Sequence, residues 1–211
     1  MAGLVRTTDA TLEPVSLQEQ KDHARILNNY EDDLLRGYIT TARVMAENRL
    51  GQAFVTQTWT KTLDRFPPYR YQNPHRAIYL DRPPLQSVTS VTYVATDGTS
   101  TVLPSSSYYV VTGDMPGYIA PVYNSFWPVA RFQPNAVTIV YKAGYGGPGA
   151  SVAASDSVDA VPVTIKQGIK LLAQHYFQVR DVDAPMPQAI ESLLGISDYG
   201  AYRIPDFEDN L

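Results

Sequence analysis

Residues 32–63 read DDLLRGYITTARVMAENRLGQAFVTQTWTKTL, and the spacing of their apolar side chains changes at Gly51. Over residues 34–50 apolar side chains recur every three or four positions, which predicts an amphipathic helix. Gly51 predicts the end of that helix, because glycine readily adopts the left-handed backbone of a helix C-terminus. Over residues 55–63 threonines alternate with larger side chains, which predicts a strand. The chain therefore passes from a helix to a sheet at this point.

Three further helices are predicted. Ser16 and Glu19 have the spacing of a capping box, in which each side chain accepts a hydrogen bond from the other residue's backbone amide. Pro162 is predicted at the first position of a helix that extends to residue 180. The apolar stripe of that helix consists of Ile165, Ile169, Leu172, Ala173 and Tyr176. Pro187 opens a last short helix that ends at Gly195.

Strands are predicted between the two groups of helices. After residues 55–63, the candidates are residues 77–81, 88–95, 101–103, 108–112 and 136–142. Asp97 and Gly98 stand between two of them, and this pair favours a tight hairpin because both residues tolerate a positive φ. Residues 54–143 are therefore predicted to form an antiparallel β module.

The predicted fold class is α+β. Residues 1–53 and 161–195 are expected to form a helical bundle, because neither terminal helix pair buries enough surface alone, and the β module is inserted between them. Residues 144–160 are rich in Gly, Ala and Ser, which predicts a flexible linker. Residues 196–211 carry four acidic residues against one arginine and are expected to form an acidic tail.

The overall composition excludes several classes of function. The formal charge of −4 argues against a dedicated nucleic-acid-binding protein, which usually has a basic surplus. The absence of cysteine excludes disulfides, thiolate metal sites and cysteine nucleophiles. No signal-peptide pattern is visible, and no apolar run approaches the roughly 18 residues that span a bilayer. We therefore expect a protein made in the cytoplasm without a membrane partner.

No arrangement of residues predicts catalysis. His23, His75 and His175 do not have the i, i+4 spacing of a helical zinc site, and each is interpreted as an ordinary surface or core-edge residue. The glycines of residues 144–149 lack the Lys-Ser/Thr that would follow in a phosphate-binding loop. The acids at residues 31–33 favour a helix start, where the dipole stabilises negative charge, over a cation site. We expect no catalytic residue, no metal and no cofactor.

The composition of two loops predicts that they form contact surfaces. Residues 64–76 interleave arginine with aromatic side chains, a composition that suits either stacking on nucleic-acid bases or a protein–protein contact. Residues 113–135 carry more aromatic area than an idle loop needs. Because the chain is acidic, we predict a subunit or partner interface, formed by Arg65, Tyr69, Arg70, Tyr71, Arg76, Tyr123, Phe126, Trp127 and Phe132.

The order of these elements resembles a known family. The likeness rests on five stretches: PVSLQEQKDHARI (14–26), DDLLRGYITTARVMAENRLGQAF (32–54), IYLDRPPLQSVTSVTYVATDG (78–98), NAVTIVYKAGYG (135–146) and VPVTIKQGIKLLAQHYFQVRD (161–181). In their order and spacing they resemble the head–tail connector, or adaptor, proteins of tailed bacteriophages. After residue 186 the chain departs from the family's pattern.

The resemblance implies a structural virion protein without an active site. Such a protein is made in the host bacterial cytoplasm and assembles in the neck as a ring beneath the portal, expected to be a dodecamer. The helices of residues 34–50 and 163–180 would form the ring wall. The ring would extend the DNA channel without sequence-specific binding and carry a downstream stopper or tail protein. Portal docking is predicted for the tail residues Tyr199, Tyr202, Arg203 and Phe207.

Two alternatives remain open from the sequence. Another virion component, of the tail or baseplate, would use its β module to bind a host glycan that stacks on Trp127. A stable monomer with glycan affinity would favour that function. A hydrolase would use His175 with Asp181 or Asp183, and turnover lost on substitution of His175 would favour it.

Overall fold

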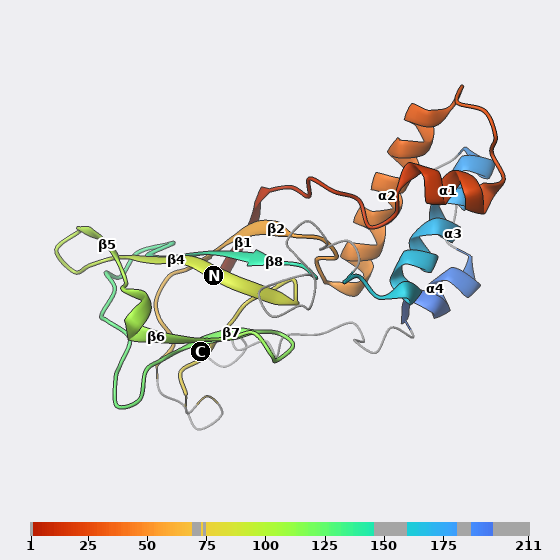
Figure 1. Cartoon of the computed structure of the whole chain (residues 1–211). Helices are drawn as coiled ribbons and strands as arrows, with labels where there is room; N and C mark the ends of the chain where they lie inside the picture. Colours follow the sequence, from red (N-terminus) through yellow and green to blue (C-terminus); the bar gives the residue numbers. More distant parts are fainter. Residues whose placement is uncertain (1, 69–72, 74, 146–159, 181–186, 196–211) are drawn as a thin grey trace.

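The structure, a computed structural model, describes residues 2–68, 73, 75–145, 160–180 and 187–195. Its helices gather at one end of the molecule and its strands at the other (Figure 1). The helices are α1 (Leu17–Ala24), α2 (Asp32–Leu50), α3 (Val163–Val179) and α4 (Gln188–Gly195). The strands are β1 (Ala2–Thr8), β2 (Gln57–Leu63), β3 (Ile78–Tyr79), β4 (Leu85–Val94), β5 (Ser100–Val102), β6 (Tyr108–Val111), β7 (Tyr118–Pro121) and β8 (Val137–Ala143), with a short 3-10 turn, η1 (Ser105–Ser107), before β6. The mixed α+β class is as predicted.

The helix ends follow the predicted signals closely. The hydroxyl of Ser16 accepts a hydrogen bond from the Glu19 amide at 3.2 Å, and the Ser16 amide donates to the Glu19 carboxylate at 2.8 Å, so the capping box of α1 is confirmed. Helix α2 stops at Gly51, which has a φ of 67°. Pro162 is the residue that caps α3, one position before the helical position predicted for it.

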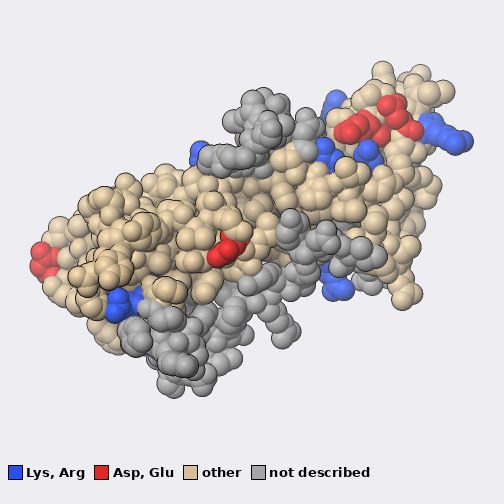
Figure 2. All heavy atoms as spheres, turned by 60° about the horizontal axis from the view of Figure 1, so that its bottom comes forward, with Lys and Arg blue, Asp and Glu red and all other residues tan. Residues whose placement is uncertain are grey.

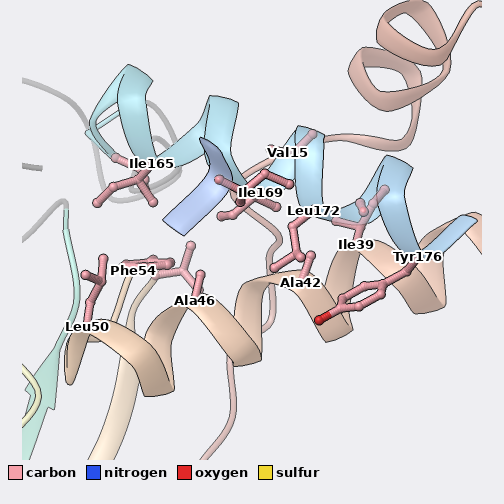
Figure 3. Packing of buried hydrophobic residues seen from close by; sticks show 14 residues of the cluster. Val15, Ile39, Ala42, Ala46, Leu50, Phe54, Ile165, Ile169, Leu172 and Tyr176 are labelled. Atoms are coloured by element: carbon pink, nitrogen blue, oxygen red, sulfur yellow. The ribbon is translucent and has the colours of Figure 1, made fainter. Parts of the chain in front are cut away.

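The helices from the two ends of the sequence pack against each other. Figure 3 shows side chains of α3 pointing toward side chains of α2 across an apolar interface. This helical core includes Ile39, Ala42, Ala46, Leu50, Ile165, Ile169, Leu172 and Tyr176, all almost completely buried. Helices α1 and α4 add Leu17 and Ile190 to it. The predicted association of the terminal helices is therefore present.

The strands form two antiparallel sheets. The larger sheet has the order β1-β2-β8-β4-β5, and the smaller has the order β3-β7-β6. In β8 every second residue is buried, which is the period-2 pattern expected of a strand with one core face. Residues of both sheets contribute to a second hydrophobic core, which includes Trp59, Leu80, Val91, Tyr108, Ile119, Ile139 and Tyr141. The predicted hairpin at Asp97-Gly98 joins β4 to β5, and Gly98 has a φ of 93°.

Two strands depart from the sequence prediction. Residues 1–53 are predicted to be part of the helical bundle, but β1 is instead an edge strand paired with β2, with Val5 opposite Thr60. The side chains of Leu4 and Val5 both lie exposed, so the sequence of β1 has no apolar alternation to reveal it. Strand β7 lies inside the predicted loop 113–135, where it pairs with β3 and β6.

None of the helices in the described part of the chain has the length and apolar character needed to cross a membrane.

Candidate functional site

We call the part of the molecule formed by the strands the β half and the part formed by the helices the helical half. The two aromatic loops predicted as contact surfaces meet at one end of the β half. Trp127 joins them, because its indole Nε1 donates a hydrogen bond to the carbonyl oxygen of Arg76 at 2.7 Å. Its ring also stacks on the ring of Phe66, with centroids 5.0 Å apart and an interplanar angle of 9°. Residues from positions 66, 76 and 127 therefore form one packed unit.

Arg76 fixes the outer part of this unit. Its Nη1 donates to the carbonyl oxygen of Ser125 at 3.2 Å, and its guanidinium carbon lies 4.2 Å from the ring centroid of Phe126. A guanidinium over an aromatic face is attracted by the ring quadrupole, which contributes about 0.5–1 kcal/mol at an exposed site. The position of Phe126 is thereby restricted although its side chain stays in solvent.

The residues of the predicted interface differ in exposure. Trp127 is 8% exposed, so its side chain belongs to the second core, and its assignment to the interface is corrected. Tyr123, Phe126 and Phe132 are exposed, as are Arg65 and Arg131. We call the exposed group, together with the half-buried Arg76, the distal surface, and it comprises Arg65, Arg76, Tyr123, Phe126, Val129, Arg131 and Phe132.

The distal surface lies at the strand ends that face away from the helices. Strand β2 follows the helical half, so the residues after its last position lie at its far end, where Asp64 accepts a hydrogen bond from the Asn135 amide at 2.9 Å. The Arg131 amide donates to the carbonyl oxygen of Val94, the last residue of β4, at 2.8 Å. Backbone contacts to β2 and β4 therefore hold this loop in place.

Several predicted contact residues lie outside the described residues. They are Tyr69, Arg70 and Tyr71 of the first loop and Tyr199, Tyr202, Arg203 and Phe207 of the tail. The predicted linker at residues 144–160 also falls almost entirely outside, as do Asp181 and Asp183 of the hydrolase alternative.

A buried ionic network, which the sequence analysis does not predict, joins the helical half to the β half. Arg43 of α2 is 1% exposed. Its guanidinium contacts Glu13 at 2.8 Å on one side and Glu47 at 2.9 Å on the other, and it lies 3.8 Å from Asp9. Glu13 and Asp9 belong to the segment between β1 and α1. We call Arg43, Glu13 and Glu47 the joint.

Glu47 connects the joint to the first residues of the β half. Its carboxylate accepts hydrogen bonds from the Phe54 amide at 2.9 Å and from the Gln57 side chain at 2.7 Å. Burial raises the pKa of Glu47, although these hydrogen bonds and the charge of Arg43 act in the opposite direction. The one signal in the sequence is the i, i+4 spacing of Arg43 and Glu47, which is common on exposed helix faces too.

The acidic cluster at the start of α2 is neutralised within its own chain. Each acid has a basic partner: Glu31 pairs with Arg180, Asp32 with Lys21 at 2.8 Å, and Asp33 with Arg36 at 2.7 Å. Figure 2 shows charges of both signs gathered at this helical end, whereas the β half of that face is largely uncharged. Within the described ranges no three His, Cys, Asp or Glu side chains are arranged to hold a metal ion.

The histidines on the helices are packing residues in this structure. The imidazole of His175 lies beside the ring of Tyr176, with centroids 5.9 Å apart. The Nε2 atoms of His175 and His23 are both buried, and neither has a hydrogen-bond partner in the described part of the chain. His75 is exposed in the loop before β3.

The comparisons with known proteins agree with the predicted class. Residues 14–94, which extend from before α1 to the end of β4, match the model of the family described as phage gp6-like head-tail connector protein. Over these residues the match bears out the resemblance to head–tail connector proteins that the sequence predicts. No curated protein matches the chain.

Solved structures share the whole fold. A chain of the virion of a native gene transfer agent particle is 22% identical, with a TM-score of 0.72 over 96% of this chain and 97% of that chain. A chain from the neck of an empty particle of this kind, computed with C6 symmetry, is 22% identical, with a TM-score of 0.71 over 97% and 98%. A third, from the neck of a native particle computed with C12 symmetry, is 23% identical, with a TM-score of 0.66 over 98% of both chains.

Proposed function

We propose that this chain is a non-enzymatic adaptor subunit that assembles as a ring beneath the portal of a phage or phage-like particle. The observation that carries the proposal is the family match over residues 14–94. The fold shared with chains from necks computed with C6 and C12 symmetry supports a cyclic assembly, and a dodecamer is the ring size proposed. The ring joins the head to the tail and extends the DNA channel.

The helical half is proposed as a helical bundle that forms the ring body. Helices α2 and α3 carry the largest part of the helical core, so they supply a rigid wall that does not depend on neighbours for its own packing. A closed ring needs two different contact patches on each subunit that meet at a closing angle. The joint fixes the helical half relative to the β half, which keeps that angle the same in every copy.

The distribution of charge suits a channel that DNA passes without being held. The whole chain carries 21 acidic residues against 17 lysines and arginines, and residues 196–211 carry four acidic residues against one arginine. Affinity for DNA phosphates comes from clustered lysine and arginine. The acidic tail is proposed as the segment that docks on the portal, and a downstream stopper or tail protein is proposed as the second partner.

The glycan-binding alternative loses its main residue. That function requires Trp127 to offer its ring to a sugar, but the ring is stacked on Phe66 and largely buried. We therefore retain the adaptor as the single proposed function.

The proposal is tested by mixing the purified chain with isolated portal rings and measuring the mass of the complexes. We expect a monomer when the chain is alone at low concentration and twelve copies on each portal ring. A chain that stays monomeric at saturating concentration with portal rings contradicts the proposal.

A further inference from the structure

The distal surface exposes several large apolar side chains that lie close together in the sequence. Four large apolar side chains lie within ten residues, and their exposed fractions are 92% for Tyr123, 70% for Phe126, 76% for Val129 and 94% for Phe132. A concentration of exposed apolar side chains is a common feature of protein interaction sites. Aromatic and arginine side chains, both present here, are the residues that dominate the binding energy of protein interfaces.

The distal surface is preorganised in the single chain. The indole of Trp127 is fixed by its hydrogen bond to Arg76 and by its stacking on Phe66, and the neighbouring backbone is bonded to Asp64 and Val94. A loop that is already ordered loses little conformational entropy on binding, so more of its contact energy appears as affinity.

The charges of the distal surface indicate the chemistry of the partner. Arg65 and Arg131 are exposed there. The carboxylate of Asp64, the residue before Arg65, and that of Asp97 each accept a backbone amide of their own chain, from Asn135 at 2.9 Å and from Thr99 at 2.8 Å. Arginine forms its strongest contacts with carboxylates. A partner that fits this surface therefore presents carboxylates between apolar side chains.

A second copy of this chain does not offer such a surface at its helical end. Leu27 and Tyr30 are exposed there, but the acids beside them are already paired with Arg180, Lys21 and Arg36 of the same chain. Docking the distal surface on that end would require these ion pairs to be broken or would place arginines near arginines.

The position of the last described residue indicates which end of the molecule faces the portal. Helix α4 ends at Gly195 in the helical half, and the sixteen residues that follow are the proposed portal-docking segment. The distal surface lies at the other end of the molecule (Figure 1). Resting on the proposed function, we propose that the distal surface faces away from the portal and binds the next neck or tail component through an acidic and apolar surface of that protein.

Photo-crosslinking in assembled particles tests this proposal. The variant Phe132→p-benzoylphenylalanine places the reactive group on the distal surface, and Tyr30→p-benzoylphenylalanine is the matched control, because Tyr30 is equally exposed at the helical end. After irradiation we expect position 132, and not position 30, to be joined to a virion protein that is neither the portal nor this chain. A product with the portal or with a second copy overturns the proposal, and so does the absence of any product at position 132.

A charge reversal provides an independent readout. The double variant Arg65→Glu, Arg131→Glu is expected to lower the yield of tailed particles at least about tenfold, the change that corresponds to losing about 1.4 kcal/mol of contact energy. Lys142→Glu, an exposed lysine of β8, is the control and is expected to leave the yield unchanged. Equal yields from the double variant and the control overturn the proposal. Cryo-electron microscopy of the same particles separates the two claims, since a chain absent from the neck contradicts the proposed function itself.

Discussion

The helical core and the distal surface hold their shapes by different means. The helical core consists of apolar side chains at helical spacing, contributed by segments more than a hundred residues apart. The distal surface is made of loops that depend on one buried indole, one guanidinium and a few backbone hydrogen bonds. Loss of one contact in the helical core is therefore expected to destabilise the whole fold, whereas loss of one contact in the distal surface is expected to act locally. The joint belongs to neither class.

The joint is expected to give the largest effect on stability. In Arg43→Ala the carboxylates of Glu13 and Glu47 lose their buried partner, and breaking a buried pair in this way costs about 3–5 kcal/mol. Urea denaturation of the purified chain measures it. The control Arg36→Ala removes an exposed pair with Asp33 and is expected to cost about 1 kcal/mol or less. Similar losses for the two variants would show that the joint is not a special contact.

The helical core comes next. Leu172→Ala opens a cavity between α3 and α2, and substitutions of this type cost about 2–5 kcal/mol. Val163→Ala on the same helix is the control, because Val163 is 80% exposed and its loss is expected to cost about 0.5 kcal/mol or less. Thermal unfolding followed by circular dichroism distinguishes the two. Equal melting temperatures would contradict the packing of α3 on α2.

The distal surface is expected to respond more weakly in stability. Trp127→Phe keeps an aromatic ring against Phe66 but removes the hydrogen bond from Nε1 to Arg76, a loss of about 0.5–1.5 kcal/mol. The same substitution is expected to increase the proteolysis of residues 122–135. Phe132→Ser provides the comparison, since this exposed side chain is expected to leave stability unchanged.

The smallest effect concerns pH and the capping box of α1. Partial burial raises the pKa of Glu19, but the hydrogen bonds from the Ser16 amide and hydroxyl and the charge of Lys170 outweigh it, so the net pKa is below its ordinary value of 4.5. A lowered folded-state pKa gives stability that is complete above 4.5 and is lost as the pH falls through the folded-state pKa. Glu19→Gln is expected to remove this part of the acid dependence in a pH series of urea denaturation curves. If the stability of Glu19→Gln falls at low pH as much as that of the unchanged chain, the capping box does not contribute to the acid dependence.

Much of the fold followed from local patterns. The spacing of apolar side chains predicted α2 and α3, and Gly51 and Asp97-Gly98 predicted a helix end and a hairpin, because each of these signals acts within a few residues. The predicted resemblance to head–tail connectors is borne out over residues 14–94 by the family match. Strand β1 was missed because both its faces lie exposed, so burial imposed no alternation on its sequence.

The surfaces were predicted less completely. The sequence indicated that the loops around Arg76 and Phe126 carry a contact surface, but it could not separate the buried Trp127 from its exposed neighbours, because all of them are aromatic. Burial of Arg43 depends on Glu13, thirty residues away in a segment without periodicity, and no local pattern predicts that pairing. Contacts of this range are settled only by the folded chain.

Reconstruction of the neck by cryo-electron microscopy, from particles in which this chain is labelled, tests the central claim most directly. The account predicts twelve copies of the chain in one closed ring beneath the portal, with the helices α2 and α3 in the ring wall. Copies found singly, or outside the junction between head and tail, would contradict it.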